Sequence, residues 1–167
     1  MKLKNETLSK NFLIYGFGKS GISSLKYLKK KNRCFIFDDD KNKIKNKYKK
    51  FFISKSKLLN NNFDYIVISP GININRCQLS NYLKKNQKKV ITDFDIFYKF
   101  NPEVLTITIT GTNGKSTTSK LLYDILKKHH YDTRLTGNIG NPILEEKRVT
   151  KNLSLIHISE PTRRNSI

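Results

Sequence analysis

One stretch of this 167-residue chain, "VLTITITGTNGKSTTSKLL" at residues 104–122, constrains the fold more than any other. Its first part alternates apolar side chains with threonine, which is typical of a β-strand. Gly111 and Gly114 then break the pattern, and Ser116 to His130 continues with apolar residues at helical spacing. A strand that runs through a glycine loop into a helix is half of a parallel strand–helix–strand unit. An α/β domain is therefore predicted to begin here.

An earlier alternation of strands and helices fills the N-terminal part of the chain. "NFLIYGFGKSGISSLKYL" predicts a strand, a glycine turn and a helix. Three further strands are predicted in "RCFIFD", "FDYIVISPG" and "KKVITDF", and the lysine-rich residues 41–50 are predicted to form a solvated helix or loop. The predicted fold class is α/β. A Rossmann-like parallel-sheet domain would span residues 1–98, and the start of a truncated P-loop α/β central domain would span residues 99–152.

The composition is strongly basic, with 33 Lys and Arg against 13 Asp and Glu and a formal net charge of +20. Such a charge would suit a nucleic-acid partner. However, the lysines are scattered among Asn, Ile, Phe and Tyr, as an AT-rich coding sequence produces, and the stacking motif of an RNA-binding sheet is missing. Nucleic acid is therefore not expected as a partner. A membrane is not expected either, because no run reaches about 18 apolar residues and no apolar signal core begins the chain. Cys34 and Cys77 lack CxxC spacing, which indicates reduced thiols in a cytoplasmic protein.

The first glycine loop has the spacing of a nucleotide site. Gly16, Gly18 and Gly21 fit G-x-G-x-x-G between a predicted strand and helix, and Asp38 ends the next strand. Glycines in such a loop admit a diphosphate to the helix N-terminus, and the acid binds a ribose. The alternative is a glycine turn that only lets strand and helix pack closely. The pattern does not distinguish a nicotinamide from a uridine nucleotide.

The second glycine loop, "GTNGKST", resembles a P-loop. Backbone amides from Gly111 to Gly114 would surround phosphates, Lys115 would bridge the β and γ oxygens, and the Ser116 hydroxyl would hold Mg²⁺. Ile109 stands where the strict motif has its first glycine. ATP and Mg²⁺ are the predicted cofactors, and Lys115 is the predicted catalytic residue. The predicted ATP site comprises Gly111, Thr112, Asn113, Gly114, Lys115, Ser116 and Thr117.

Several segments together resemble the Mur ligases, a family of ATP-dependent amide ligases of peptidoglycan precursor synthesis. The segments are "YGFGKSGISSLKYL", "FDYIVISPGI", "VITDFDIFYKF" and "ITGTNGKSTTSKLL", followed by "GNIGNP". They stand in the family's order and cover roughly residues 10 to 145. "TGTNGKST" is shared with other Mur ligases and with folylpolyglutamate synthase, so a ligase of either kind is an alternative.

The resemblance implies a reaction, substrates and a substrate site. The family member most like these segments joins D-glutamate to UDP-N-acetylmuramoyl-L-alanine through an acyl phosphate, and a monomer is expected. The UDP-sugar site would comprise Gly16, Gly18, Lys19, Ser20, Asp38, Ser69, Pro70, Gly71 and Asn138. Alternatively, Ser69 to Gly71 would be only a strand-ending turn, Lys19 a solvated side chain, and Asn138 part of a packed loop.

Two other classes of function stay open from the sequence. A nicotinamide-dependent oxidoreductase could use Gly16 to Gly21, although "TGTNGKST" would then have no role. A basic nucleic-acid-binding module could use the excess lysine, and its DNA affinity would fall steeply with salt.

The last part of the chain differs in composition from the rest. Residues 153–167, "LSLIHISEPTRRNSI", lose the Lys and Asn bias and look like the translation of a sequencing-library adaptor. They are expected to be a read-through tail outside the fold, the alternative being a divergent natural tail. The family's glutamate-bearing strand, carbamylated lysine and C-terminal domain are not matched. The fragment is therefore expected to be inactive as a ligase.

Overall fold

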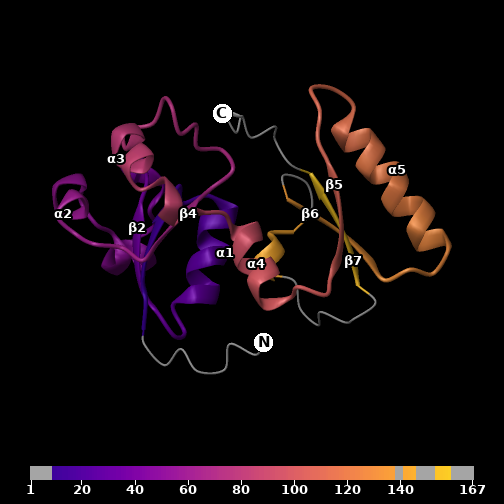
Figure 1. Cartoon of the computed structure of the whole chain (residues 1–167), viewed down its shortest axis with the longest axis horizontal. Helices are drawn as coiled ribbons and strands as arrows, with labels where there is room; N and C mark the ends of the chain where they lie inside the picture. The colour runs from indigo at the N-terminus through magenta and orange to yellow at the C-terminus, as the bar shows by residue number, and fades with distance from the viewer. Residues whose placement is uncertain (1–8, 138–140, 146–152, 159–167) are drawn as a thin grey trace. The chain divides into compact units, whose positions relative to one another are not determined.

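The structure, a computed structural model, describes residues 9–137, 141–145 and 153–158. It divides the chain into two compact units, Met1–Ile96 and Phe97–Ile167. Strands and helices alternate within each unit, and the described strands pair in parallel (Figure 1). The predicted α/β class is confirmed. The predicted domain limits at residues 98 and 152 stay predictions.

The first unit is built on a four-stranded parallel sheet. Its strands are β1 (Asn11–Tyr15), β2 (Arg33–Phe37), β3 (Tyr65–Ile68) and β4 (Val90–Ile91), in the order β2-β1-β3-β4. In doubly wound sheets of this order the chain switches direction between β1 and β3, and ligands bind outside the carboxyl ends of the strands at that point. The loop after β1 and the turn after β3 are thereby brought to one edge of the sheet.

Helices and short turns connect these strands. The helices are α1 (Lys19–Leu28), α2 (Lys55–Leu59), α3 (Ser80–Lys85) and α4 (Asp93–Phe100). The lysine-rich segment forms two 3-10 turns, Lys41–Lys43 and Asn46–Phe51, and a third turn spans Gln87–Lys89. α4 begins in the first unit and ends in the second.

Strand β1 forms the centre of the first unit's core. Leu13, Ile14 and Tyr15 expose none of their surface. A parallel strand covered on both faces has such a continuous apolar run, and so "NFLIY" does not alternate. Cys34 is buried on β2 and Cys77 is half-buried, and both are free thiols as expected.

The second unit has a three-stranded parallel sheet in the order β5-β7-β6. Its elements are β5 (Leu105–Ile109), α5 (Lys115–Lys128), β6 (Thr133–Gly137), a 3-10 turn (Ile143–Glu145) and β7 (Ser154–Ile158). α5 packs along β6 and β7 (Figure 1). Strand β5 is less covered, and Leu105 is exposed.

Part of the expected tail belongs to this sheet. β7 is the middle strand, pairing with β5 on one side and β6 on the other, and its Leu155 and Ile156 are fully buried. Residues Leu153 to Ile158, which were assigned from the sequence to a read-through tail, thus take part in the sheet of the second unit. An alternating apolar segment can join a sheet whatever its compositional bias. The read-through origin stays a prediction, and residues 159–167 lie outside the described part.

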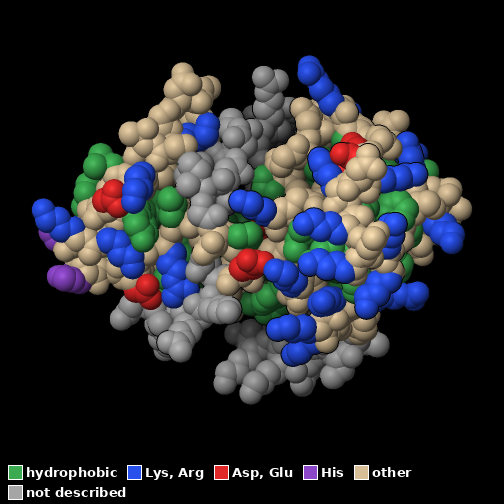
Figure 2. Space-filling view, turned by 180° about the vertical axis from the view of Figure 1, so that it is seen from behind, with side chains coloured by type: hydrophobic (Ala, Val, Ile, Leu, Met, Phe, Trp, Pro, Cys, Tyr) green, Lys and Arg blue, Asp and Glu red, His purple; other side chains and the backbone are tan. Residues whose placement is uncertain are grey.

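Both units carry positive side chains on their surface. On the face that Figure 2 shows, Lys and Arg side chains lie on both units and are more numerous on the first. In the described residues, no helix has the length and apolar character needed to cross a membrane.

Candidate functional sites

The first candidate site is the glycine loop between β1 and α1. Gly16 is buried at φ +90°, a backbone conformation that favours glycine, and its N–H donates to the Phe37 carbonyl (2.9 Å). A Cβ on Gly21 would lie 2.1 Å from the Gly16 carbonyl oxygen. Gly16 and Gly21 are thus required by close packing within the loop. A Cβ on Gly18 would meet no atom within 4 Å, so the loop is open at this glycine.

Three polar side chains hold this loop in place. Phe17 N–H donates to Asp38 Oδ2 (2.6 Å), and the Ser69 hydroxyl donates to the Gly16 carbonyl (2.7 Å). The Ser20 hydroxyl donates to Asp93 Oδ2 (2.5 Å). Asp38 and Ser69, predicted from the sequence to contact a ligand, therefore bond the loop's own backbone, whereas Ser20 bonds the side chain of Asp93.

Asp38, at the end of β2, is buried beside the loop. It is 4% exposed, and its Oδ1 accepts from Asp40 N–H at 2.9 Å, with Lys43 Nζ 4.0 Å away. The Tyr48 ring packs edge-on against Phe17, with ring centroids 5.0 Å apart. The basic segment after β2 is thus fixed beside the glycine loop, and sequence reasoning missed this contact because no local pattern encodes it.

Tyr15, the last residue of β1, also contacts a polar side chain. Its hydroxyl donates to Asp39 Oδ1 (2.7 Å). Burial raises the pKa of Tyr15 well above its usual range, and hydrogen bonds with Cys77 and Asp39 raise this pKa further. Tyr15 therefore stays a neutral donor and serves as structural support for the loop.

The remaining predicted substrate residues divide by exposure. Lys19, Pro70 and Gly71 are exposed, and Gly71 has open space where a Cβ would stand. They are free of packing that would hide them from a ligand. Asn138 lies outside the described residues.

The second candidate site is the loop between β5 and α5. Gly111 has φ +149° and Gly114 has φ +76°, so both occupy backbone conformations that favour glycine. Gly114 is the N-cap of α5, and its carbonyl accepts from Thr118 N–H (2.9 Å). The Ser119 hydroxyl donates to the Lys115 carbonyl (2.7 Å). The loop therefore turns the chain directly into a helix whose first N–H groups have no intrahelical partner.

Lys115 is half-buried at the start of α5. Its Nζ donates to the carbonyl oxygens of Gly111 and Thr112, the latter at 3.3 Å. Its ammonium group therefore points back over the loop. Thr112, Asn113, Ser116 and Thr117 are exposed.

The chemistry of this loop fits a nucleotide triphosphate. Free helix N–H groups and an ammonium group are the donors that phosphate oxygens need. The exposed Ser116 hydroxyl could serve Mg²⁺, which usually keeps several waters and phosphate oxygens as ligands. Within the described ranges, no group of three His, Cys, Asp or Glu residues is arranged to hold a metal.

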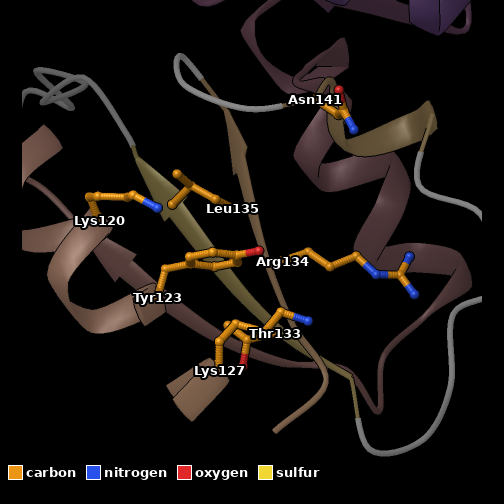
Figure 3. A pocket seen from close by; sticks show the side chains of 7 residues that line it. All are labelled: Lys120, Tyr123, Lys127, Thr133, Arg134, Leu135 and Asn141. Carbon is orange, nitrogen blue, oxygen red and sulfur yellow. The ribbon is translucent and has the colours of Figure 1, made fainter. Parts of the chain in front are cut away.

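A surface pocket of about 380 Å³ is lined mainly by residues of α5 and β6 (Figure 3). The Tyr123 ring has Lys120 Nζ 5.1 Å and Lys127 Nζ 5.9 Å from its centroid, and Lys120 also pairs with Asp124. The lining residues are Lys120, Tyr123, Lys127, Thr133, Arg134, Leu135 and Asn141. None of these residues belongs to a predicted site. The two glycine loops, which present helix N–H groups to a ligand, are therefore kept as the candidate sites.

The two sets of predicted residues are therefore each brought together within their own unit. Gly16, Gly18, Ser20, Asp38 and Ser69 lie around the end of β1. Residues 111–117 form one loop before α5. Asp93 was not predicted as a site residue, although its place two residues after the end of β4 was a signal that could have found it.

Known proteins resemble this chain over most of its length. Residues 109–161 match the Mur ligase middle domain. The chain is 35% identical over 141 residues to the UDP-N-acetylmuramoylalanine--D-glutamate ligase of Rickettsia bellii, covering 82% of this chain and 31% of that protein. It is 32% identical over 151 residues to the same-named ligase of Clostridioides difficile, covering 81% and 32%. For the same-named ligase of Aquifex aeolicus the identity is 36% over 135 residues, covering 80% and 30%.

A solved structure is also similar, that of UDP-N-acetylmuramate:L-alanyl-gamma-D-glutamyl-meso-diaminopimelate ligase from Neisseria meningitides. Its TM-score is 0.49 at 13% identity, over 90% of this chain and 52% of that one. The chain spans about a third of the length of the curated relatives named above. From the identities to those relatives and the middle-domain match, the chain belongs to the Mur ligase family.

Proposed function

We propose that this chain supplies the nucleotide-binding part of an ATP-dependent amide ligase that adds D-glutamate to UDP-N-acetylmuramoyl-L-alanine. The observation that carries the proposal is the second glycine loop, where Lys115 begins α5 directly after the left-handed Gly114. The relatives' names support the choice of substrates. Such a ligase would be a cytoplasmic enzyme of cell-wall synthesis.

In the proposed reaction, ATP phosphorylates the substrate carboxylate, and the amine of D-glutamate displaces phosphate from the acyl phosphate. Lys115 and the first N–H groups of α5 would bind the terminal phosphates and neutralise their charge. To do so, the Lys115 ammonium group must leave the Gly111 and Thr112 carbonyls that it now contacts. Ser116 would offer its hydroxyl to Mg²⁺, which supplies further positive charge to the transferring phosphoryl group.

The first unit is proposed to bind the UDP part of the substrate. The open glycine at Gly18 lies at the start of α1, where free N–H groups can receive a diphosphate. Exposed Lys19, Pro70 and Gly71 surround the same edge of the sheet, and Asp38 and Ser69 keep the loop in shape. Asn138 is kept as a substrate contact by family resemblance alone.

Calorimetric titration with MgATP tests the proposal for the second loop. We expect Lys115→Met to weaken MgATP binding by at least about tenfold, because charge-assisted bonds to phosphate are lost. Lys120→Met is the matched control, since Lys120 is an exposed lysine on the same helix that pairs with Asp124. Equal MgATP affinity in the two variants, or no binding by the unmodified chain, would contradict the proposal.

A further inference from the structure

Ser20 and Asp93 form a hydroxyl–carboxylate pair beside the first glycine loop. Ser20 lies in the first turn of α1, two residues after Gly18, and its hydroxyl donates to Asp93 Oδ2 over 2.5 Å. Asp93 is the first residue of α4 and is only 8% exposed. Its other oxygen, Oδ1, accepts from Phe94 N–H (3.0 Å). Each carboxylate oxygen of Asp93 therefore has its own partner.

This pair fixes the polarity that Ser20 presents to a ligand. A serine hydroxyl can donate one hydrogen bond, and here that bond is donated to Asp93. Toward the open side of the loop Ser20 can offer only lone pairs. A phosphate oxygen also offers only lone pairs, and the nearby carboxylate charge would repel it. A diphosphate at the start of α1 would thus receive no hydrogen bond from Ser20 and would depend on backbone N–H groups and on the exposed Lys19.

We propose that Asp93 is a positioning residue that turns the Ser20 hydroxyl away from a bound diphosphate and so restrains the affinity of the first glycine loop for nucleoside diphosphates. This inference rests on the proposed UDP-binding role of the first unit. With a lower affinity for the diphosphate, substrate recognition depends more on contacts with the rest of the nucleotide sugar. The lower affinity also favours release of the product. If Asp93 were only a structural support, its replacement would weaken binding.

Asp93→Asn reverses the polarity with little change of shape. If Oδ1 keeps its bond to Phe94 N–H, the new Nδ2 lies where Oδ2 was and donates to Ser20 Oγ. The Ser20 proton is then free for a phosphate oxygen. We expect Asp93→Asn to bind inorganic pyrophosphate and UDP about three- to tenfold more tightly than the unmodified chain, by titration calorimetry. Binding of uridine, which has no phosphate, should be unchanged.

Two further variants separate this effect from a general change of charge. Asp95→Asn removes the same charge from an exposed residue of the same helix, whose carboxylate is bonded to Thr92 N–H (2.7 Å) and the Thr92 hydroxyl (2.8 Å). It should leave pyrophosphate affinity within about twofold, because exposed charges are largely screened by salt. Combining Ser20→Ala with Asp93→Asn should abolish the gain, since the gain requires the freed hydroxyl.

The outcomes are distinct. If UDP binds the unmodified chain but Asp93→Asn binds UDP and pyrophosphate equally or more weakly, the inference is overturned and the UDP site stands. A Ser20-dependent gain for pyrophosphate without any UDP binding supports the inference and contradicts the UDP assignment. Absence of pyrophosphate and UDP binding in every variant overturns both. Should Asp93→Asn fail to fold, Asp93→Ser removes the charge, leaves the Thr92 hydroxyl to cap α4, and is expected to show the same gain.

Discussion

At the scale of single residues, the glycines of the first loop differ in what they do. Gly21 packs its Cα against the Gly16 carbonyl, whereas Gly18 faces open space. We expect Gly21→Ala to lower the free energy of unfolding by at least about 2 kcal/mol, because backbone atoms must move apart to admit a methyl group. Urea denaturation of the first unit measures this change.

Gly18→Ala is the matched control for that substitution. Gly18 has φ −80°, which alanine adopts without strain, and a Cβ there meets nothing within 4 Å. Its effect on the free energy of unfolding should stay within about 0.5 kcal/mol. If Gly18→Ala is as unstable as Gly21→Ala, the conclusion that Gly21 is closely packed and Gly18 faces open space is refuted.

Cys34 gives the first unit a pH dependence in the alkaline range. Burial raises the pKa of the Cys34 thiol from 9.0 to about 11. Well below pH 9 the thiol keeps its proton in both the folded and unfolded chain. Between pH 9 and 11 the unfolded chain loses it more readily, so the free energy of unfolding should fall as the pH rises.

The variant Cys34→Val tests this link to the thiol. Its free energy of unfolding should fall less steeply between pH 9 and 11 than that of the unmodified chain. A residual slope is expected, because burial also raises the pKa values of Tyr15, Tyr27 and Tyr82. Identical slopes in urea denaturation at each pH would show that Cys34 does not contribute.

The residue scale also shows the limit of site prediction from sequence. The spacing of Gly16, Gly18 and Gly21 correctly indicated a loop between a strand and a helix. It could not show that Asp38 bonds Phe17 N–H or that Ser20 bonds Asp93, since the latter partner lies 73 residues along the chain. Such partners follow from the order of strands in the sheet, which local patterns do not encode.

At the scale of elements, β7 decides the integrity of the second sheet. It separates β5 from β6, and Leu155 is fully buried. Leu155→Asp would bury an unpaired charge between two strands, and we expect it to unfold the second unit while the first stays folded. Hydrogen exchange measured peptide by peptide should then show rapid exchange in residues 105–137 and unchanged protection in β1 and β3.

Leu105→Asp provides the control for that experiment. Leu105 is 63% exposed at the start of β5, so a carboxylate there remains in water. Exchange in the second unit should match that of the unmodified chain. Protection that persists in residues 105–137 of Leu155→Asp would mean that β5 and β6 do not depend on β7.

Elements were predicted well where the apolar pattern was long. The segments that became β1, β2, β3 and β5 were identified as strands, and residues 116–130 as a helix. β7 was missed because its altered composition suggested a foreign tail, and composition does not determine pairing. The second glycine loop was located by the same strand and helix, but the bonds from Lys115 to the Gly111 and Thr112 carbonyls depend on side-chain geometry that sequence does not show.

At the scale of the whole molecule, repulsion between positively charged chains opposes the association that exposed apolar side chains favour. The net charge is +20. Large apolar side chains of the second unit are exposed, among them Phe100, Leu105, Leu121, Ile125 and Tyr131. We expect the chain to stay dispersed at low ionic strength and to associate as salt screens the repulsion. Light scattering against sodium chloride concentration measures this association.

The variant Leu121→Gln tests which surface is responsible. Leu121 is 61% exposed on α5, so its replacement should leave folding unchanged and move the onset of association to higher salt. Association that weakens as salt is added would instead point to contacts between opposite charges.

The place of β7 in the sheet also has a consequence during synthesis. The strand that joins β5 to β6 is the last of the three to be translated. Until it leaves the ribosome, β5 and β6 have no strand between them to pair with, while β1, β2 and β3 can already assemble upstream. The backbone groups of β5 and β6 that face β7 therefore stay unpaired during this interval. Chaperones that shield unpaired strand edges would act on the second unit at this stage.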